Sequence, residues 1–224
     1  MEITNSRLLH NGGGANEHIG CVGFVYGSGK LDKVIMDDCS SIGNGGGATI
    51  YTPYKVEFTN AVIRKSQAAI GGAFWIMLSP DVALQHVKID GCKATVGDGG
   101  GLAILVGATV ALTEVTVRDS RAPGSGGCLY AAGAGSTSTL HHVVLDGCTA
   151  KDGGGLFVGA LANVVASPLT IADCHALGSG GGLAVSGGVV NLHNGSISSK
   201  AAEMRSDETL KGGLIDVAGG AGRT

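Results

Sequence analysis

The chain has 224 residues, of which 41 are glycine, 44% are hydrophobic and 15% are charged, and its formal net charge is -3. This apolar content argues against a disordered chain, and the glycines lack the three-residue spacing of collagen. The 15 basic residues are spread along the sequence, so no surface for nucleic acid is indicated. No apolar run reaches the roughly 18 residues of a membrane-spanning helix, and we expect no membrane span.

A Gly-Gly-Gly-Leu motif recurs along the whole chain, most clearly at 99–102, 153–156 and 180–183. Such repeats are typical of solenoids, in which each unit buries its apolar side only by stacking on its neighbours. We expect the glycines to supply either a positive φ or a close approach between stacked backbones. When the copies of the motif are aligned, the residues 17–23 stand out as an insertion. The middle position of every copy is a glycine: Gly13, Gly46, Gly72, Gly100, Gly127, Gly154, Gly181 and Gly212.

Each repeat contains three short stretches in which apolar residues alternate, taken here in chain order. Stretches this short with a period of two predict strands and not helices. Most repeats are 26 to 28 residues long, which leaves no room for a crossover helix. The sequence therefore predicts an all-β parallel β-helix of about seven or eight rungs with three strands per rung. Examples are 56–58, 82–84 and 110–112 for the first stretch, 87–89, 115–117 and 143–145 for the second, and 102–104, 156–158 and 183–185 for the third.

Equivalent positions in successive repeats are apolar, as an inward-facing ladder requires. We expect one domain over 1–224, with the charged segment 201–211 as a loop or cap. Because the sequence begins and ends within a repeat, we expect further rungs or another subunit to continue the stack. The inward positions are Val34, Ala61, Val87, Val115, Val143 and Leu169, then Met36, Ile63, Ile89, Val117, Leu145 and Ile171, and on the third strand Ala48, Phe74, Leu102, Leu129, Leu156, Leu183 and Leu214.

Four of the six cysteines, Cys39, Cys92, Cys148 and Cys174, occupy one repeat position. The same position holds serine at 6, 66 and 120, which indicates a small buried residue more than a bridge. Only Cys148 and Cys174 lie on adjacent repeats, where strand spacing permits a disulfide without requiring one. The cysteines leave the redox compartment open.

The Gly-Gly-Ala-Phe at 71–74, the Gly-Gly-Gly-Leu copies and the Phe58-Thr59-Asn60 segment resemble the repeats of polymorphic outer membrane proteins and related right-handed β-helix surface proteins. That family carries Gly-Gly-Ala-Ile and Phe-x-x-Asn motifs. Most repeats here carry Asp-x-Cys or Asp-Gly-Cys in place of the second motif. The resemblance implies a right-handed β-helix at the cell surface or outside the cell that serves adhesion or display.

One outward column alternates in charge, and we interpret it first as a solvated ladder that stabilises the fold modestly. An alternative is a polysaccharide lyase or glycoside hydrolase of the pectin-lyase-like β-helix type, acting through Asp90, Arg118, Asp146 and His142. The neighbouring column of His86, Glu114 and His142 would have to converge to hold a metal ion, so we expect neither a metal nor a cofactor there. The alternating column is Asp37, Arg64, Asp90, Arg118, Asp146 and Ala172.

The outward positions of the third strand are apolar, whereas a solvated sheet face carries polar residues. We expect a protein partner or a second copy of the chain to cover this face, with glycans as an alternative ligand, since rings can stack on sugars. The predicted function is a non-catalytic structural or adhesive module of an extracellular or cell-surface assembly. Asn194-Gly195-Ser196 is a glycosylation acceptor if the protein is secreted. The predicted binding residues are Trp75, Tyr130, Phe157, Tyr51, Met77 and Leu105.

Overall fold

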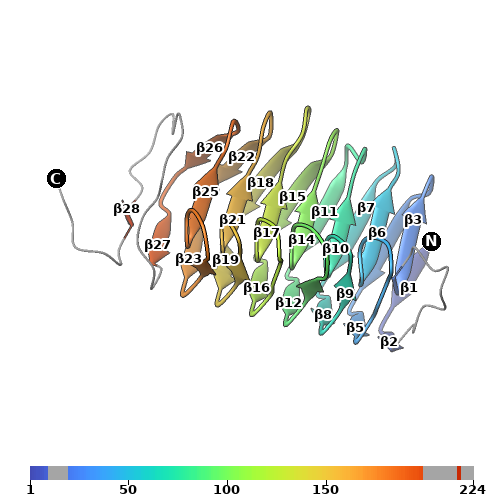
Figure 1. The fold of residues 1–224 in the computed structure, drawn as a ribbon. Coiled ribbons are helices and arrows are strands. Elements are labelled where there is room, and N and C mark those ends of the chain that lie inside the picture. The colour runs from blue at the N-terminus through green and yellow to red at the C-terminus, as the bar shows by residue number, and fades with distance from the viewer. Residues whose placement is uncertain (10–19, 199–215, 218–224) are drawn as a thin grey trace.

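The computed structural model describes residues 1–9, 20–198 and 216–217, and over these residues the chain is a parallel β-solenoid of about seven turns without a helix. Each turn contributes one strand to each of three parallel sheets that run the length of the rod (Figure 1). The predicted all-β fold with three strands per rung is confirmed.

The three long sheets follow the three stretches found in each repeat. Sheet A contains β1 (Glu2–Thr4), β4 (Gly29–Asp32), β7 (Val56–Thr59), β11 (Val82–Gln85), β15 (Thr109–Thr113), β18 (Thr137–His141), β22 (Asn163–Ala166) and β26 (Val189–Leu192). Sheet B contains β2 (Arg7–Leu9), β5 (Ile35–Asp37), β8 (Val62–Arg64), β12 (Lys88–Asp90), β16 (Thr116–Arg118), β19 (Val143–Asp146), β23 (Leu169–Ala172), β27 (Ser196–Ser198) and β28 (Asp216–Val217). Sheet C contains β3 (Val22–Val25), β6 (Ala48–Tyr51), β10 (Phe74–Ile76), β14 (Leu102–Ile104), β17 (Leu129–Ala131), β21 (Leu156–Val158) and β25 (Leu183–Val185).

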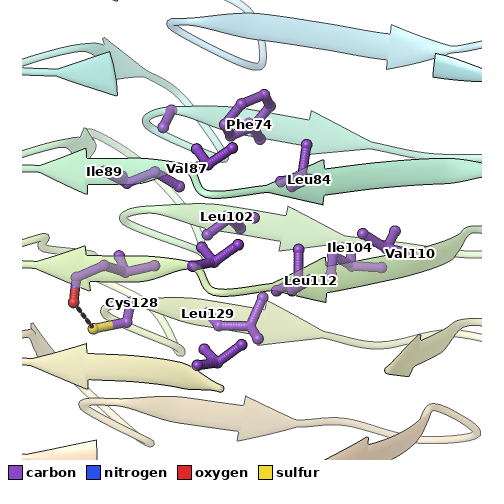
Figure 2. Close-up of a cluster of buried hydrophobic side chains, with 14 of the residues drawn as sticks. Phe74, Leu84, Val87, Ile89, Leu102, Ile104, Val110, Leu112, Cys128 and Leu129 are labelled. Carbon is purple, nitrogen blue, oxygen red and sulfur yellow. Dashed lines mark hydrogen bonds between the residues drawn. The ribbon is translucent and has the colours of Figure 1, made fainter. Parts of the chain in front are cut away.

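The register of the sheets stacks like positions directly over one another. Leu102 pairs with Leu129, and Leu129 pairs with Leu156. The predicted inward positions within the described residues are at most 2% exposed, whereas Leu214 lies outside them. Figure 2 shows Phe74, Leu102 and Leu129 succeeding one another along this core. Since a fully buried Leu or Ile contributes about 1.5–3 kcal/mol, every rung adds its own stabilising layer.

A column of buried alanines, which the sequence pattern did not reveal, lies at the corner between sheets B and C. The two-residue strands β9 (Gln67–Ala68) and β13 (Lys93–Ala94) pair there, as do β20 (Thr149–Ala150) and β24 (His175–Ala176). Ala94, Ala122 and Ala150 form a small apolar cluster of their own. Small side chains fit this corner because the backbone turns sharply within a few residues.

The glycine corner uses both of the expected physical reasons, at different positions. The first glycine of the motif has a positive φ, as at Gly99 (+69°), which residues with a side chain rarely adopt. The middle glycine allows a close approach, since a Cβ at Gly100 would lie 2.4 Å from the carbonyl oxygen of Gly127 on the next rung. The motif therefore encodes a turn and a tight stack together.

The first rung differs from the predicted alignment. Val22 pairs with Ala48, and Cys21 N–H donates to the carbonyl oxygen of Gly46 at 3.1 Å, so Gly20 and not Gly13 occupies the middle-glycine position. The assignment of 17–23 to an insertion was therefore wrong for 20–23, which belong to the rung. Gly13, Gly212 and the segment 201–211 lie outside the described residues.

Two disulfides join neighbouring rungs, Cys21 to Cys39 and Cys128 to Cys148. Cys39 and Cys148 come from the predicted small-residue position, so interpreting them as unbridged was wrong. Their partners come from a different column, the third position of the glycine motif on the preceding rung, and the Cα atoms are 5.6 and 5.5 Å apart. Cys92 and Cys174 are free and buried, as predicted for that position.

Candidate functional site

The outer face of sheet C carries the six side chains predicted to contact a partner. Phe74 and Ile76 point into the core and are fully buried, so Trp75 between them points outward. We call this set the aromatic face, and each of its members is partly exposed: Tyr51, Trp75, Met77, Leu105, Tyr130 and Phe157. An apolar outer face is unusual for a sheet that meets water on that side.

The rings of the aromatic face form two ordered groups. Tyr51 and Trp75 stack with centroids 6.5 Å apart and planes at 20°, and Tyr26 meets Tyr51 edge-on at 5.6 Å. Tyr130 and Phe157 stack more closely, at 5.4 Å and 7°. Ala103, aligned with both Trp75 and Tyr130, separates the groups. Such pairs are worth about 0.5–1.5 kcal/mol beyond burial, so the rings form preordered flat surfaces.

Apolar side chains continue from the aromatic face around the corner that follows sheet C. Leu78 is 41% exposed, Val106 is 40% exposed and Leu161 is 71% exposed. Leu78 and Val106 directly follow Met77 and Leu105 in the chain. Single exposed apolar residues are common, but here they adjoin a sheet face that is already apolar.

A polar column beside the aromatic face was not predicted from the sequence. It consists of Asp98, Ser125, Asp152 and Ser179, each just before the first glycine of a motif. The backbone N–H of Ser125 donates to Asp98 Oδ1 at 2.6 Å, and that of Ser179 donates to Asp152 Oδ1 at 2.8 Å. Burial, and then the charge of Asp98, raise the pKa of Tyr130. The alternation of Asp-Gly-Gly with Ser-Gly-Gly in the sequence is the signal that could have revealed this column.

The charged ladder of sheet B is formed in part. Asp37 Oδ2 lies 2.8 Å from Nη2 of both Arg64 and Arg7, and these hydrogen bonds lower the pKa of Asp37 to about 2. Arg118 Nε lies 3.5 Å from Asp146 Oδ2. Among the described residues, Asp90 makes no ion pair within 4.0 Å, although it is aligned with Arg118. The ion pairs of the ladder therefore form two separate groups, one at Asp37 and one at Asp146, and each group stabilises its own part of the rod.

The four residues of the enzymatic alternative are not gathered around one point. His142 precedes β19 and Asp146 ends it, so their Cα atoms are about 13 Å apart at about 3.3 Å per residue. Asp90 and Asp146 lie two rungs apart with Arg118 between them, where the scissile bond of a substrate would have to lie. No observation favours an acid/base pair here.

The column of histidines and glutamate lies at the corner between sheets A and B. His86 Nδ1 is 3.0 Å from Glu114 Oε2, with both side chains more than half exposed, while the ring of His142 packs edge-on against His141. Within the described ranges, Cys128, Cys148 and Cys174 form the one group of three ligand-type side chains whose ligand atoms lie within 4.8 Å of one another. The Cys128–Cys148 disulfide leaves only one thiol in that group.

Two further predictions concern the surroundings of the protein. Asn194 of the glycosylation triplet is exposed in the turn before β27. In the described part of the chain, the structure contains no helix with the length and apolar character needed to cross a membrane.

No family model matches this chain. Searches of curated proteins and of solved structures also found no match. The resemblance to polymorphic outer membrane protein repeats is therefore supported only at the level of a parallel β-solenoid.

Proposed function

We propose that this chain is a non-catalytic structural or adhesive β-helix module that binds protein partners, including further copies of itself, through the aromatic face. The observation that carries the proposal is the preordered apolar outer surface of sheet C, with its Tyr51–Trp75 and Tyr130–Phe157 stacks. Aromatic residues in flat, rigid arrays are enriched at the energetic centres of protein interfaces.

We also propose an extracellular or cell-surface location. Two disulfides support this part of the proposal, because such bonds persist in oxidising compartments. The exposed Asn194 triplet is compatible with it, since N-glycosylation requires an accessible turn.

Sedimentation velocity tests whether the aromatic face forms the protein contact. The measurement compares the wild type with a Trp75→Asp, Tyr130→Asp double variant. Both rings are partly exposed, so charges at these sites should leave the fold intact while placing carboxylates in the interface. Because anchors of this kind are worth about 2 kcal/mol each, the two substitutions together should cost about 4 kcal/mol and weaken association by about 700-fold.

The matched control is Lys88→Asp with Thr170→Asp, both on the exposed outer face of sheet B. Far-UV circular dichroism should show the same fold in all three proteins. A wild type that stays monomeric up to about 200 µM, above the range of most specific contacts, would contradict self-assembly. Unchanged association in the double variant would contradict the assignment of the aromatic face.

A further inference from the structure

A hollow of about 260 Å³ lies where the ring stack of sheet C ends. Phe157 and Ala184 line its apolar side, and Ser125, Asp152, Ser179 and Ser186 line its polar side. Its size falls just below that of ordinary small-molecule pockets, which begin at about 300 Å³. It therefore has room for one small ring and not for an extended ligand.

The hollow exists because a ring is missing from a repeated arrangement. The segments 124–130 and 178–184 are alike, Gly-Ser-Gly-Gly-Cys-Leu-Tyr and Gly-Ser-Gly-Gly-Gly-Leu-Ala. Both place a serine N–H on the aspartate of the preceding rung, Ser125 on Asp98 and Ser179 on Asp152. In the segment 124–130, Tyr130 fills the space beside Asp98. In the segment 178–184, Ala184 leaves the equivalent space beside Asp152 open.

The register of the strands places an aromatic ring along one side of this open space. Tyr130, Phe157 and Ala184 are aligned on successive strands. The ring of Phe157 is stacked on Tyr130 and has no second ring neighbour among the described residues. Since Ala184 takes the next place in the column, the side of Phe157 away from Tyr130 faces the hollow.

The polar side of the hollow determines which kind of ring-shaped ligand can bind there. Asp152 Oδ1 accepts the Ser179 N–H, while Oδ2 and the hydroxyls of Ser125, Ser179 and Ser186 make no hydrogen bond within the described residues. A phenylalanine ring from a partner would bury this carboxylate without giving it a donor, and a tyrosine or tryptophan ring would bring only a single donor, so burying the polar side under such a ring is costly. A pyranose has an apolar C–H face for Phe157 and hydroxyl donors for Asp152, and the negative charge disfavours acidic sugars.

We propose that this hollow is a binding subsite for one neutral pyranose unit of a glycan. This subsite lies on the same sheet as the proposed protein contact, but the proposal of a glycan subsite does not depend on that contact. For one ring of about a dozen non-hydrogen atoms, we expect a Kd of about 1–10 mM.

The test is saturation-transfer-difference NMR together with chemical-shift titration of labelled protein, using the methyl glycosides of glucose, galactose and mannose up to about 50 mM, several times the expected Kd. We expect at least one glycoside to bind saturably and to shift the resonances of Phe157 and Ala184. Ala184→Tyr should abolish binding by filling the hollow, as Tyr130 does on its own rung. Asp152→Asn keeps an acceptor for the Ser179 N–H and should weaken binding about tenfold, as expected for loss of a hydrogen bond to a charged group.

Thr170→Tyr on sheet B is the control and should bind like the wild type. Absence of saturable binding by all three glycosides would overturn the proposal, as would equal binding by wild type and Ala184→Tyr. Binding of p-cresol, a tyrosine side-chain analogue, without binding of any glycoside would also overturn it, in favour of a protein side chain. Sedimentation of the same Ala184→Tyr variant reports separately on the protein contact.

Discussion

Replacing Gly100 with alanine tests whether stacking, and not backbone conformation alone, requires glycine in the middle column. A Cβ there would lie 2.4 Å from the oxygen of Gly127 and 2.5 Å from backbone atoms of Arg121. Real Cβ atoms essentially never come closer than 3.0 Å, so the rungs must separate by at least 0.6 Å at this point. The Gly101 N–H to Gly127 carbonyl bond would lengthen from 3.1 Å to about 3.7 Å, beyond hydrogen-bonding distance.

The expected cost follows from that displacement. An unmade buried backbone hydrogen bond costs about 1–3 kcal/mol, and overpacking costs about 1–3 kcal/mol more. We therefore expect Gly100→Ala to destabilise the protein by about 3 kcal/mol or more. With a slope of about 2 kcal/mol per molar urea, the unfolding midpoint should fall by about 1.5 M.

Two other glycines separate the contributions in the same urea titration. Gly91 has a φ of +61°, and a Cβ at this residue would have no atom within 4 Å, so Gly91→Ala should cost only the conformational strain of about 1–2 kcal/mol. Gly27 has neither constraint, and Gly27→Ala should leave the midpoint nearly unchanged. If Gly100→Ala proved no more damaging than Gly91→Ala, the stacking argument would be refuted.

Three further predictions concern the core, the cysteines and the ladder. Leu129→Ala, at a fully buried site, should cost about 2–5 kcal/mol by urea unfolding, whereas Leu177→Ala, 85% exposed, should stay within about 0.5 kcal/mol; equal effects would contradict the core assignment. Burial raises the pKa of Cys92 to about 12 and of Cys174 to about 11, so iodoacetamide without reductant should add two labels by mass spectrometry only after unfolding. Four labels would contradict one of the disulfides, and six labels would contradict both. Asp37→Asn should lower the thermal midpoint near neutral pH. Because the folded pKa of Asp37 is lowered to about 2 from about 3.9 in the unfolded chain, its stabilising effect is present above about pH 4 and lost as the pH falls through about 2. The midpoint difference between variant and wild type should disappear there, and a difference that persisted would contradict the Arg7–Asp37–Arg64 contacts.

The core columns could be predicted because a period of two and a fixed repeat length leave little freedom. Once Leu102, Leu129 and Leu156 are assigned to one column, the pairing of their rungs follows, and the structure has that register. The first rung escaped prediction because Gly13 lies in a glycine run that imitates the motif, whereas the position is held by Gly20 followed by Cys21. The pattern alone could not distinguish the two alignments.

The disulfides and the ring stacks depend on side-chain direction, which a column alignment does not contain. Cys128 and Cys148 belong to different columns, yet their Cα atoms lie 5.5 Å apart and their side chains meet in a disulfide. Tyr51 is two residues beyond Thr49, the partner of Trp75, yet its ring stacks on Trp75. Side chains lean along a strand, so rings from diagonal positions can meet. The aromatic face was predicted as a set of residues, but its division into two stacks was not.

The two disulfides bear on how the rod would respond to tension applied along the polypeptide. They close loops of 18 and 20 residues, each spanning less than one full turn of the coil. Pulling on both ends would unravel the remaining rungs while those loops stay shut. At about 3.4 Å per residue, and with the bridges themselves spanning 5.6 and 5.5 Å between Cα atoms, the fully extended chain should be shorter by about 120 Å than after reduction. Single-molecule force extension with and without reductant would measure this difference directly.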